Sequence, residues 1–283
     1  MNSLRINGFP LRGLAFAALL ACAPACAPAA STPPPAASTP PPAGSAPVTT
    51  TSSPPASRRY HVRVIDRVRT DRADARGLEL VGEVLVENTG RTVRAVAPST
   101  GEVRAQQSVP ADGGIALTPA GLWHVSSSAT ILRDPVTLVE RRRAPASHET
   151  WGLCHDGIRL VQSDGTTQLL LRDRDTAGLV GEVRVATREW GTARLGELHC
   201  VTVNGYPQVW AVVTGTDWMI RVDLSTGLVT AVADLTAVTV AERPTGADEV
   251  IGGVAAVAGG GDELWLTGRH FDHRYRIRLQ PGP

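Results

Sequence analysis

The stretch WGLCHDGIRLVQSDGTTQLLLRD, from Trp151 to Asp173, is the clearest indication of the architecture. Three short apolar segments, ending at Leu153 and spanning Ile158 to Val161 and Leu169 to Leu171, are separated by HDG and SDG. Asp, Gly and Ser at these places are typical of tight turns, and no helix fits between them. The stretch therefore predicts two consecutive hairpins in a small antiparallel sheet, which must bury a face against neighbouring sheets.

Looser copies of this unit recur along the chain from Arg59, at intervals of roughly 40 to 50 residues. The copies start at Gly77-Leu78, Gly114-Ile115, Gly152-Leu153, Glu197-Leu198 and Gly253-Val254. Later polar turns fall at Ser99-Thr100-Gly101, Asp134-Pro135, Asp173-Arg174-Asp175 and Ser225-Thr226-Gly227. Five copies, each with several short strands, predict an all-β fold, a five-bladed β-propeller. Two stacked β-sandwiches are the alternative.

A ring of blades needs a closure that leaves no exposed strand edge. The segment YHVRVI, Tyr60 to Ile65, is a strand candidate at the start of the repeat region, and Tyr275 to Leu279 is one at its end. We therefore expect these two segments to pair.

The first 57 residues differ in composition from the rest. Residues 1–22 read as a lipoprotein signal peptide: Arg5 and Arg12 precede an apolar run that is too short to span a bilayer, and LLAC, ending at Cys22, resembles a bacterial lipobox. An ordinary secretory signal is the alternative. Residues 23–57 consist mostly of Ala, Pro, Ser and Thr, which predicts an extended, disordered tether. The expected location is extracytoplasmic, in a bacterial cell envelope, with a lipid on Cys22 holding residues 58–283 at the membrane.

Composition limits the choice of partners. The formal net charge is +1, every basic residue other than histidine is arginine, and acidic residues are interspersed among the arginines, which argues against nucleic-acid binding. We expect a monomer. Cys154 and Cys200 are the cysteines of the folded part. In an oxidising compartment they could form a disulfide, or they could be two small buried residues.

Taken in order, the motifs resemble those of the plant and bacterial glutaminyl-peptide cyclotransferases over Tyr60 to Leu279. The matching segments are RGLELVGEVLVENTGR, ETWGLCHDGIRLVQSDGTTQLLLRD, LGELHCVTVNG, IRVDLSTGLVTAVADL and IGGVAAVAGGGDELWLTGRHF. The resemblance implies a five-bladed propeller and an acyltransferase that turns the N-terminal glutamine of a peptide into pyroglutamate with loss of ammonia. It also implies that no metal or other cofactor takes part.

Carried over residue by residue, the resemblance implies two candidate catalytic carboxylates. The first glutamate of the family's LNELE motif is kept as Glu197. The family's FGEG motif aligns with Ala111 to Gly114, so its proton-carrying glutamate falls on Gly113, next to Asp112. A hydrogen-bonded buried acceptor is the alternative role for Glu197.

Three further positions are candidates for substrate binding. Trp151 is retained from the family's GWG motif, while the glutamine of QGL and the lysine of TGK become Arg76 and Arg269. Trp151 could instead pack between blades, and the two arginines could be either an anion-binding pair or salt-bridged surface groups. Other large or polar family residues are replaced, at Ser127, Gly196, His199 and Thr214.

Two functions stay open from the sequence. One is the family's pyroglutamate-forming reaction in a rearranged pocket. The other is a catalytically degenerate propeller, a pseudoenzyme that binds a peptide or other ligand at the channel mouth or acts as a scaffold. Two motifs are secondary: His270 and His273 have a spacing that could suit a metal on a helix, and Arg141 to Arg143 read as a solvated loop that could touch anionic lipid headgroups.

Overall fold

A computed structural model of the chain describes residues 57–109, 113–126, 128–146, 148–186, 193–246 and 250–282. The chain divides into two units, Met1–Ser52 and Ser53–Pro283, and all described residues belong to the second unit. The described residues form twenty strands and one short helix, α1 (Thr236–Glu242). This helix, the only one in the described ranges, lacks the length and apolar character needed to cross a membrane.

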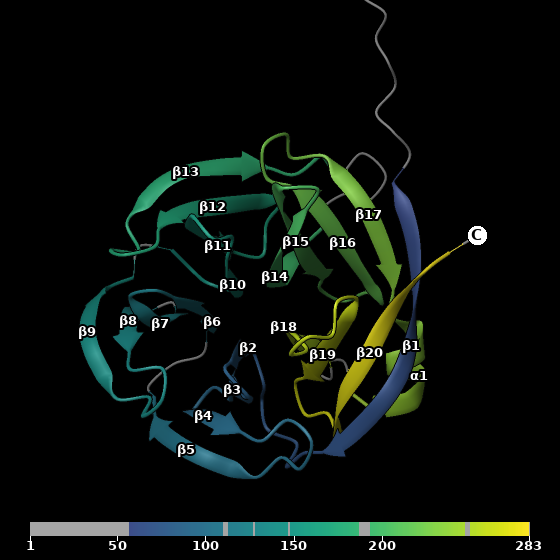
Figure 1. Cartoon of the computed structure of the whole chain (residues 1–283), viewed down its shortest axis with the longest axis horizontal. Coiled ribbons are helices and arrows are strands. Elements are labelled where there is room, and N and C mark those ends of the chain that lie inside the picture. The colour runs from purple at the N-terminus through teal and green to yellow at the C-terminus, as the bar shows by residue number, and fades with distance from the viewer. Residues whose placement is uncertain are drawn as a thin grey trace, which may run out of the picture. The chain divides into compact units, whose positions relative to one another are not determined.

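The strands form five four-stranded antiparallel blades around a common axis, which confirms the predicted five-bladed β-propeller (Figure 1). Blades 1 to 4 follow the chain in order and consist of β2 (Gly77–Val81), β3 (Val84–Asn88), β4 (Thr92–Val96) and β5 (Val103–Ser108); β6 (Gly113–Thr118), β7 (Gly121–Ser126), β8 (Ala129–Arg133) and β9 (Glu140–Pro145); β10 (Gly152–His155), β11 (Arg159–Ser163), β12 (Gln168–Asp173) and β13 (Leu179–Arg184); and β14 (Leu195–Val203), β15 (Tyr206–Val213), β16 (Trp218–Asp223) and β17 (Val229–Asp234). The first strand of each blade lies nearest the axis.

Blade 5 is built from both ends of the propeller. It contains β18 (Ile251–Ala256), β19 (Glu263–Gly268) and β20 (His273–Pro281), and its fourth, outer strand is β1 (Arg58–Arg69). β1 runs antiparallel to β20, with Val62 opposite Leu279 and Val64 opposite Ile277. The predicted closure is therefore confirmed, and the first four residues of β1 also pair in parallel with β17 of blade 4.

The polar turns of the repeat occupy equivalent places, between the third and fourth strands of blades 1 to 4. In three of these turns an aspartate accepts hydrogen bonds from the backbone N–H groups two and three residues further on. The shortest of these bonds measure 2.7 Å for Asp134, 2.8 Å for Asp173 and 2.8 Å for Asp223. Local side-chain bonding of this kind favours a turn over a continued strand, so the sequence pattern marks where each outer strand begins.

Glycines allow the innermost strands to approach one another closely. A Cβ atom on Gly114 would lie 2.5 Å from the backbone nitrogen of Leu153 in the next blade. A Cβ atom on Gly152 would likewise lie 2.5 Å from the carbonyl oxygen of Gly196. Both distances are too short for any side chain, so a glycine near the start of an innermost strand sets the spacing between blades.

A disulfide joins two of these innermost strands. Cys154 on β10 and Cys200 on β14 are bonded, with Cα atoms 5.5 Å apart and 46 positions apart in the sequence. Of the two possibilities left open by the sequence, the paired one is correct. The bond links blades 3 and 4 near the axis.

The arginine run read as a loop is instead part of a strand. Arg141, Arg142 and Arg143 belong to β9, the exposed outer strand of blade 2. The guanidinium of Arg142 lies 5.1 Å from the ring centroid of Trp123, and Arg143 pairs with Glu140. The prediction of a loop was wrong because an outer blade strand has no buried face, and its polar sequence carries no alternation.

The disulfide gives a stability prediction. Closing a loop of this length removes about 4 kcal/mol of chain entropy from the unfolded state. We expect a reductant, or the double substitution Cys154→Ser with Cys200→Ser, to lower the melting temperature by roughly 5–15 °C, since each kcal/mol corresponds to about 2–4 °C in a domain of this size. Differential scanning calorimetry with and without dithiothreitol measures the shift. The double variant should not respond to reductant, and a wild-type melting temperature indifferent to reductant would contradict the assignment.

Candidate functional site

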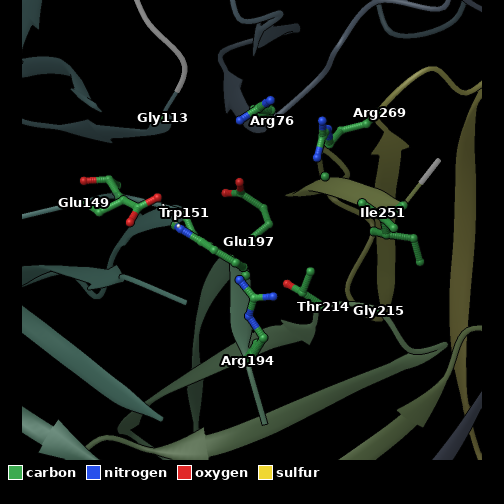
Figure 2. A pocket seen from close by; sticks show the side chains of 14 residues that line it. Arg76, Gly113, Glu149, Trp151, Arg194, Glu197, Thr214, Gly215, Ile251 and Arg269 are labelled. Carbon is green, nitrogen blue, oxygen red and sulfur yellow. Dashed lines mark hydrogen bonds between the residues drawn. The ribbon is translucent and has the colours of Figure 1, made fainter. Parts of the chain in front are cut away.

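A cavity of about 520 Å³ opens at one end of the propeller channel, where the innermost strands begin (Figure 2). Its walls come from the first residues of these strands and from the segments just before them. The lining residues are Arg76, Gly113, Glu149, Thr150, Trp151, Arg194, Gly196, Glu197, Thr214, Gly215, Val250, Ile251, Gly252 and Arg269. Its size suits a ligand of a few tens of atoms.

The turn at the centre of the defining stretch positions Trp151. Gly165, in the SDG turn and with φ of +79°, lies against the indole, and a Cβ atom there would come within 2.6 Å of the ring. Gln162 donates hydrogen bonds to the carbonyl oxygen of Glu149 (2.9 Å) and to the hydroxyl of Thr150 (2.8 Å), which fixes the segment leading into Trp151.

Two charged side chains hold the indole at the cavity wall. The guanidinium of Arg194 lies 4.4 Å from the ring centroid, and the indole Nε1 donates to Glu149 at 3.0 Å. Stacking of a guanidinium on an indole adds a cation–π attraction. Trp151 therefore lines the cavity, the first of the two roles that the sequence left open.

Glu197 presents a buried carboxyl group to the cavity. The residue is 3% exposed, and neither carboxylate oxygen has a hydrogen-bond partner in the described part of the chain. Burial raises the pKa of Glu197 well above its ordinary value, while the nearby backbone N–H groups of Leu198 and Leu153 only moderate the rise. The expectation of a hydrogen-bonded buried acceptor is thus wrong, because no side chain or N–H group of the described residues completes a bond to these oxygens.

Two more titratable groups face the channel. Glu79 on β2 accepts hydrogen bonds from the N–H groups of Leu80 (3.0 Å) and Leu117 (3.2 Å), and burial raises its pKa to about 7. Its charge contributes to the raised pKa of Glu197. On β14, two residues beyond Glu197, burial lowers the pKa of His199 to about 4, so this imidazole is uncharged near neutral pH.

Arg76 and Arg269 share one carboxylate at another wall of the cavity. The Nε atom of Arg76 lies 3.0 Å from both carboxylate oxygens of Asp74, and the Nε atom of Arg269 lies 2.9 Å from one of them. Although burial raises the pKa of Asp74, hydrogen bonds and charge from the two arginines hold it below its ordinary value. The arginines are therefore both cavity-lining and salt-bridged, which combines the two expectations.

Gly113 lies where the family's carboxylate was expected, and it leaves no room for one. Its φ is +150°, and a Cβ atom would be 2.0 Å from the carbonyl oxygen of Val125. Side chains of the preceding blades fix the backbone here: Asn88 donates to the carbonyl oxygen of Gly113 at 2.8 Å, and Ser163 donates to that of Gly196 at 2.6 Å. Asp112, the neighbouring candidate, lies outside the described residues, as do Ser127 and Cys22.

The structure brings together four of the sequence candidates, Glu197, Trp151, Arg76 and Arg269, around one cavity. It separates the histidine pair, because Nδ1 of His270 lies 3.2 Å from the carbonyl oxygen of Arg72 whereas Nδ1 of His273 lies 3.3 Å from Glu242. Within the described ranges no three His, Cys, Asp or Glu side chains cluster in a way that could hold a metal ion.

Sequence reasoning missed Glu149, Arg194 and Glu79, and treated Thr214 only as a lost tryptophan. Glu149 stands two residues before Trp151 in a segment already singled out, so it could have been found. The position of Thr214 could not have been found: a Cβ atom on Gly196 would lie 2.5 Å from its Oγ1, so the hydroxyl packs over the backbone beside Glu197.

Comparisons with known proteins agree with this architecture. A family model described as glutamine cyclotransferase matches residues 41–279. The crystal structure of Myxococcus xanthus glutaminyl cyclase is similar, with a TM-score of 0.72 and 25% sequence identity, covering 80% of this chain and 100% of that one. The WD40 domain of Neurospora crassa Pan2 has a TM-score of 0.41 and 12% identity, covering 74% of this chain and 76% of its own. A comparison with curated proteins gave no match.

The carboxyl group of Glu197 predicts a pH-dependent stability. Because its folded pKa is raised, the folded protein holds a proton that the unfolded chain releases above about pH 4.5, and stability is lost as the pH rises from there through the folded pKa. Glu197→Gln cannot ionise, so we expect it to raise the melting temperature by several degrees at pH 8 and by almost nothing at pH 4. Melting curves of both proteins across this range measure the difference.

The exposed Glu83 supplies the control, since Glu83→Gln should leave the melting temperature unchanged at both pH values. A difference between wild type and Glu197→Gln that does not vary with pH would contradict the burial of an ionisable carboxyl.

The crowding at Gly113 predicts a large effect of one methyl group. Gly113→Ala must displace the backbone of β7, so we expect a loss of several kcal/mol of unfolding free energy or failure to fold. Gly205→Ala is the matched control, because Gly205 also has positive φ (+82°) but nothing within 4 Å of its Cβ position, and it should cost only about 1–2 kcal/mol. Equal urea midpoints for the two variants would show that Gly113 is not crowded.

Proposed function

This chain belongs to the glutamine cyclotransferase family, and from that premise we propose that it converts the N-terminal glutamine of a peptide into pyroglutamate with release of ammonia. The observation that carries the proposal is the carboxyl group of Glu197, which is buried at the cavity wall, holds its proton above the ordinary range and has no partner among the described residues. A buried titratable group of this kind is suited to exchange a proton with a bound substrate.

The reaction requires one proton to be relayed. The neutral α-amine, whose unperturbed pKa is near 8, attacks the side-chain amide carbon, and the bond from that carbon to the amide nitrogen then breaks. In the proposed mechanism Glu197 donates its proton to the departing nitrogen, which leaves as ammonia. The carboxylate then takes the proton that the new ring nitrogen releases. Glu197 therefore ends the cycle as it began.

Neighbouring groups supply the other requirements. We assign Trp151 as the apolar wall that orients the glutamine side chain. The hydroxyl of Thr214, packed over Gly196, is the proposed donor to the tetrahedral oxyanion. Arg269 positions the substrate, and Arg76 supports it through the shared Asp74. Asp112 stays a second candidate carboxylate next to Gly113.

Gly113 favours a second candidate function. The family's proton-carrying glutamate falls on this position, and its backbone accepts no side chain without rearrangement. A propeller that has lost this group could retain the cavity as a binding site for peptide N-termini without turning them over. In that case Glu197 serves as a hydrogen-bonding partner for the bound amine.

We further propose that the propeller works outside the cytoplasm, in the bacterial cell envelope, tethered by residues 23–57 to a lipid on Cys22. Support comes from the arginines and short apolar run that precede the LLAC motif. The disulfide between Cys154 and Cys200 also supports this location, because such bonds persist in oxidising compartments.

Ammonia release tests the proposal. Purified protein incubated with Gln-Ala amide should release ammonia, and Glu197→Gln should lower the rate by about 100-fold or more, as expected when a proton-transferring group is lost. Glu83→Gln is the matched control and should retain the full rate. Binding of the peptide without release would favour the second candidate, and neither binding nor release at millimolar peptide would contradict both.

A further inference from the structure

The wall formed by Arg76, Asp74 and Arg269 carries more positive charge than its partners neutralise. Two guanidinium groups share a single carboxylate, which leaves one net positive charge on the wall. Arg269 contacts Asp74 through Nε, and within the described ranges its two terminal nitrogens have no hydrogen-bond partner. A guanidinium with free terminal donors is suited to bind a carboxylate.

The remaining charges of the cavity do not compensate for this wall. Glu149 and Arg194 both contact Trp151 and offset each other. Glu197 keeps its proton over a wide pH range and so contributes little negative charge. Figure 2 shows the carboxyl group of Glu197 and the guanidinium groups of Arg76 and Arg269 directed into the same space. The cavity thus offers a neutral proton donor at one side and a cation at another.

The cationic wall is also held in place before any ligand arrives. Asp74 accepts both Nε atoms at 2.9 to 3.0 Å, and its backbone forms an isolated bridge with that of Arg269. Side chains fixed in this way lose little freedom on binding, which increases the affinity that a given contact provides.

We propose that the Arg76–Arg269 wall is a subsite for a carboxylate located one residue beyond the N-terminal residue of the bound peptide. This inference rests on the proposed function, because it seats the N-terminal residue against Glu197 and Trp151. The carboxylate comes either from an acidic side chain at the second position or from the free C-terminus of a dipeptide. A cavity of about 520 Å³ holds a ligand of dipeptide size. The preferred ligands are therefore short or acidic peptides rather than peptides in general.

Calorimetric titration of four peptides tests the inference, with Glu197→Gln as the background so that no peptide is consumed. Gln-Ala amide and Gln-Gln amide are neutral at this subsite, Gln-Ala carries a C-terminal carboxylate, and Gln-Glu amide carries one on the second side chain. We expect at least one of the carboxylate peptides to bind roughly tenfold more tightly than its neutral counterpart, as is usual for a charge-assisted contact at a partly exposed site. Which of them does so identifies the source of the carboxylate.

The substitution Arg269→Gln, added to the same background, should reduce this preference to about twofold or less without weakening the neutral peptides. Arg63→Gln is the control, because Arg63 is exposed on β1 and its loss changes the net charge equally. Equal affinities for the carboxylate peptides and their neutral counterparts, no binding of either carboxylate peptide at millimolar concentration, or a preference that survives Arg269→Gln would overturn the inference. Ammonia release by the wild type is scored separately, so an active enzyme without the preference would refute the subsite and leave the proposed function standing.

Discussion

The close approach of the five innermost strands is the constraint on which the rest of this structure depends. Near the axis the blades meet with so little space that Gly114 and Gly152 cannot carry even a methyl group. Side chains large enough to form a pocket can therefore project only where the strands begin, at the mouth of the channel. The cavity occupies this place, and Glu197 and Trp151 reach it from the first residues of β14 and from just before β10.

The same crowding determines the chemistry of the cavity. A carboxylate removed from water is costly unless hydrogen bonds or opposite charges compensate. Asp74 is compensated by two arginines and stays ionised, whereas Glu197 has no such partners and keeps its proton. Two acidic side chains of one cavity are thus held in opposite states by their surroundings, which is the arrangement that acid–base chemistry requires. Gly113 shows the limit of this design, because the backbone there excludes a further side chain.

The sequence was sufficient to predict the fold because repetition and turn chemistry are local. The turns at Asp134, Asp173 and Asp223 are built from hydrogen bonds within three residues, and the glycines at the strand starts recur with each blade. The site was only partly predictable, since its groups meet across blades. Trp151, Arg76 and Arg269 were found through motifs. The sharing of Asp74, the stacking of Arg194 and the missing partners of Glu197 depend on distances that no local pattern encodes.

The origin of blade 5 in both ends of the propeller imposes an order on how the molecule can be assembled. β1 leaves the ribosome before every other strand, yet its partners β17 and β20 are the last of blades 4 and 5 to be made. Contacts between such distant parts of a chain form slowly. The first strand must wait, unpaired, through synthesis of all the intervening blades. A chain destined to pass through a membrane before folding gains from this delay, because the ring cannot lock until its final residues have arrived.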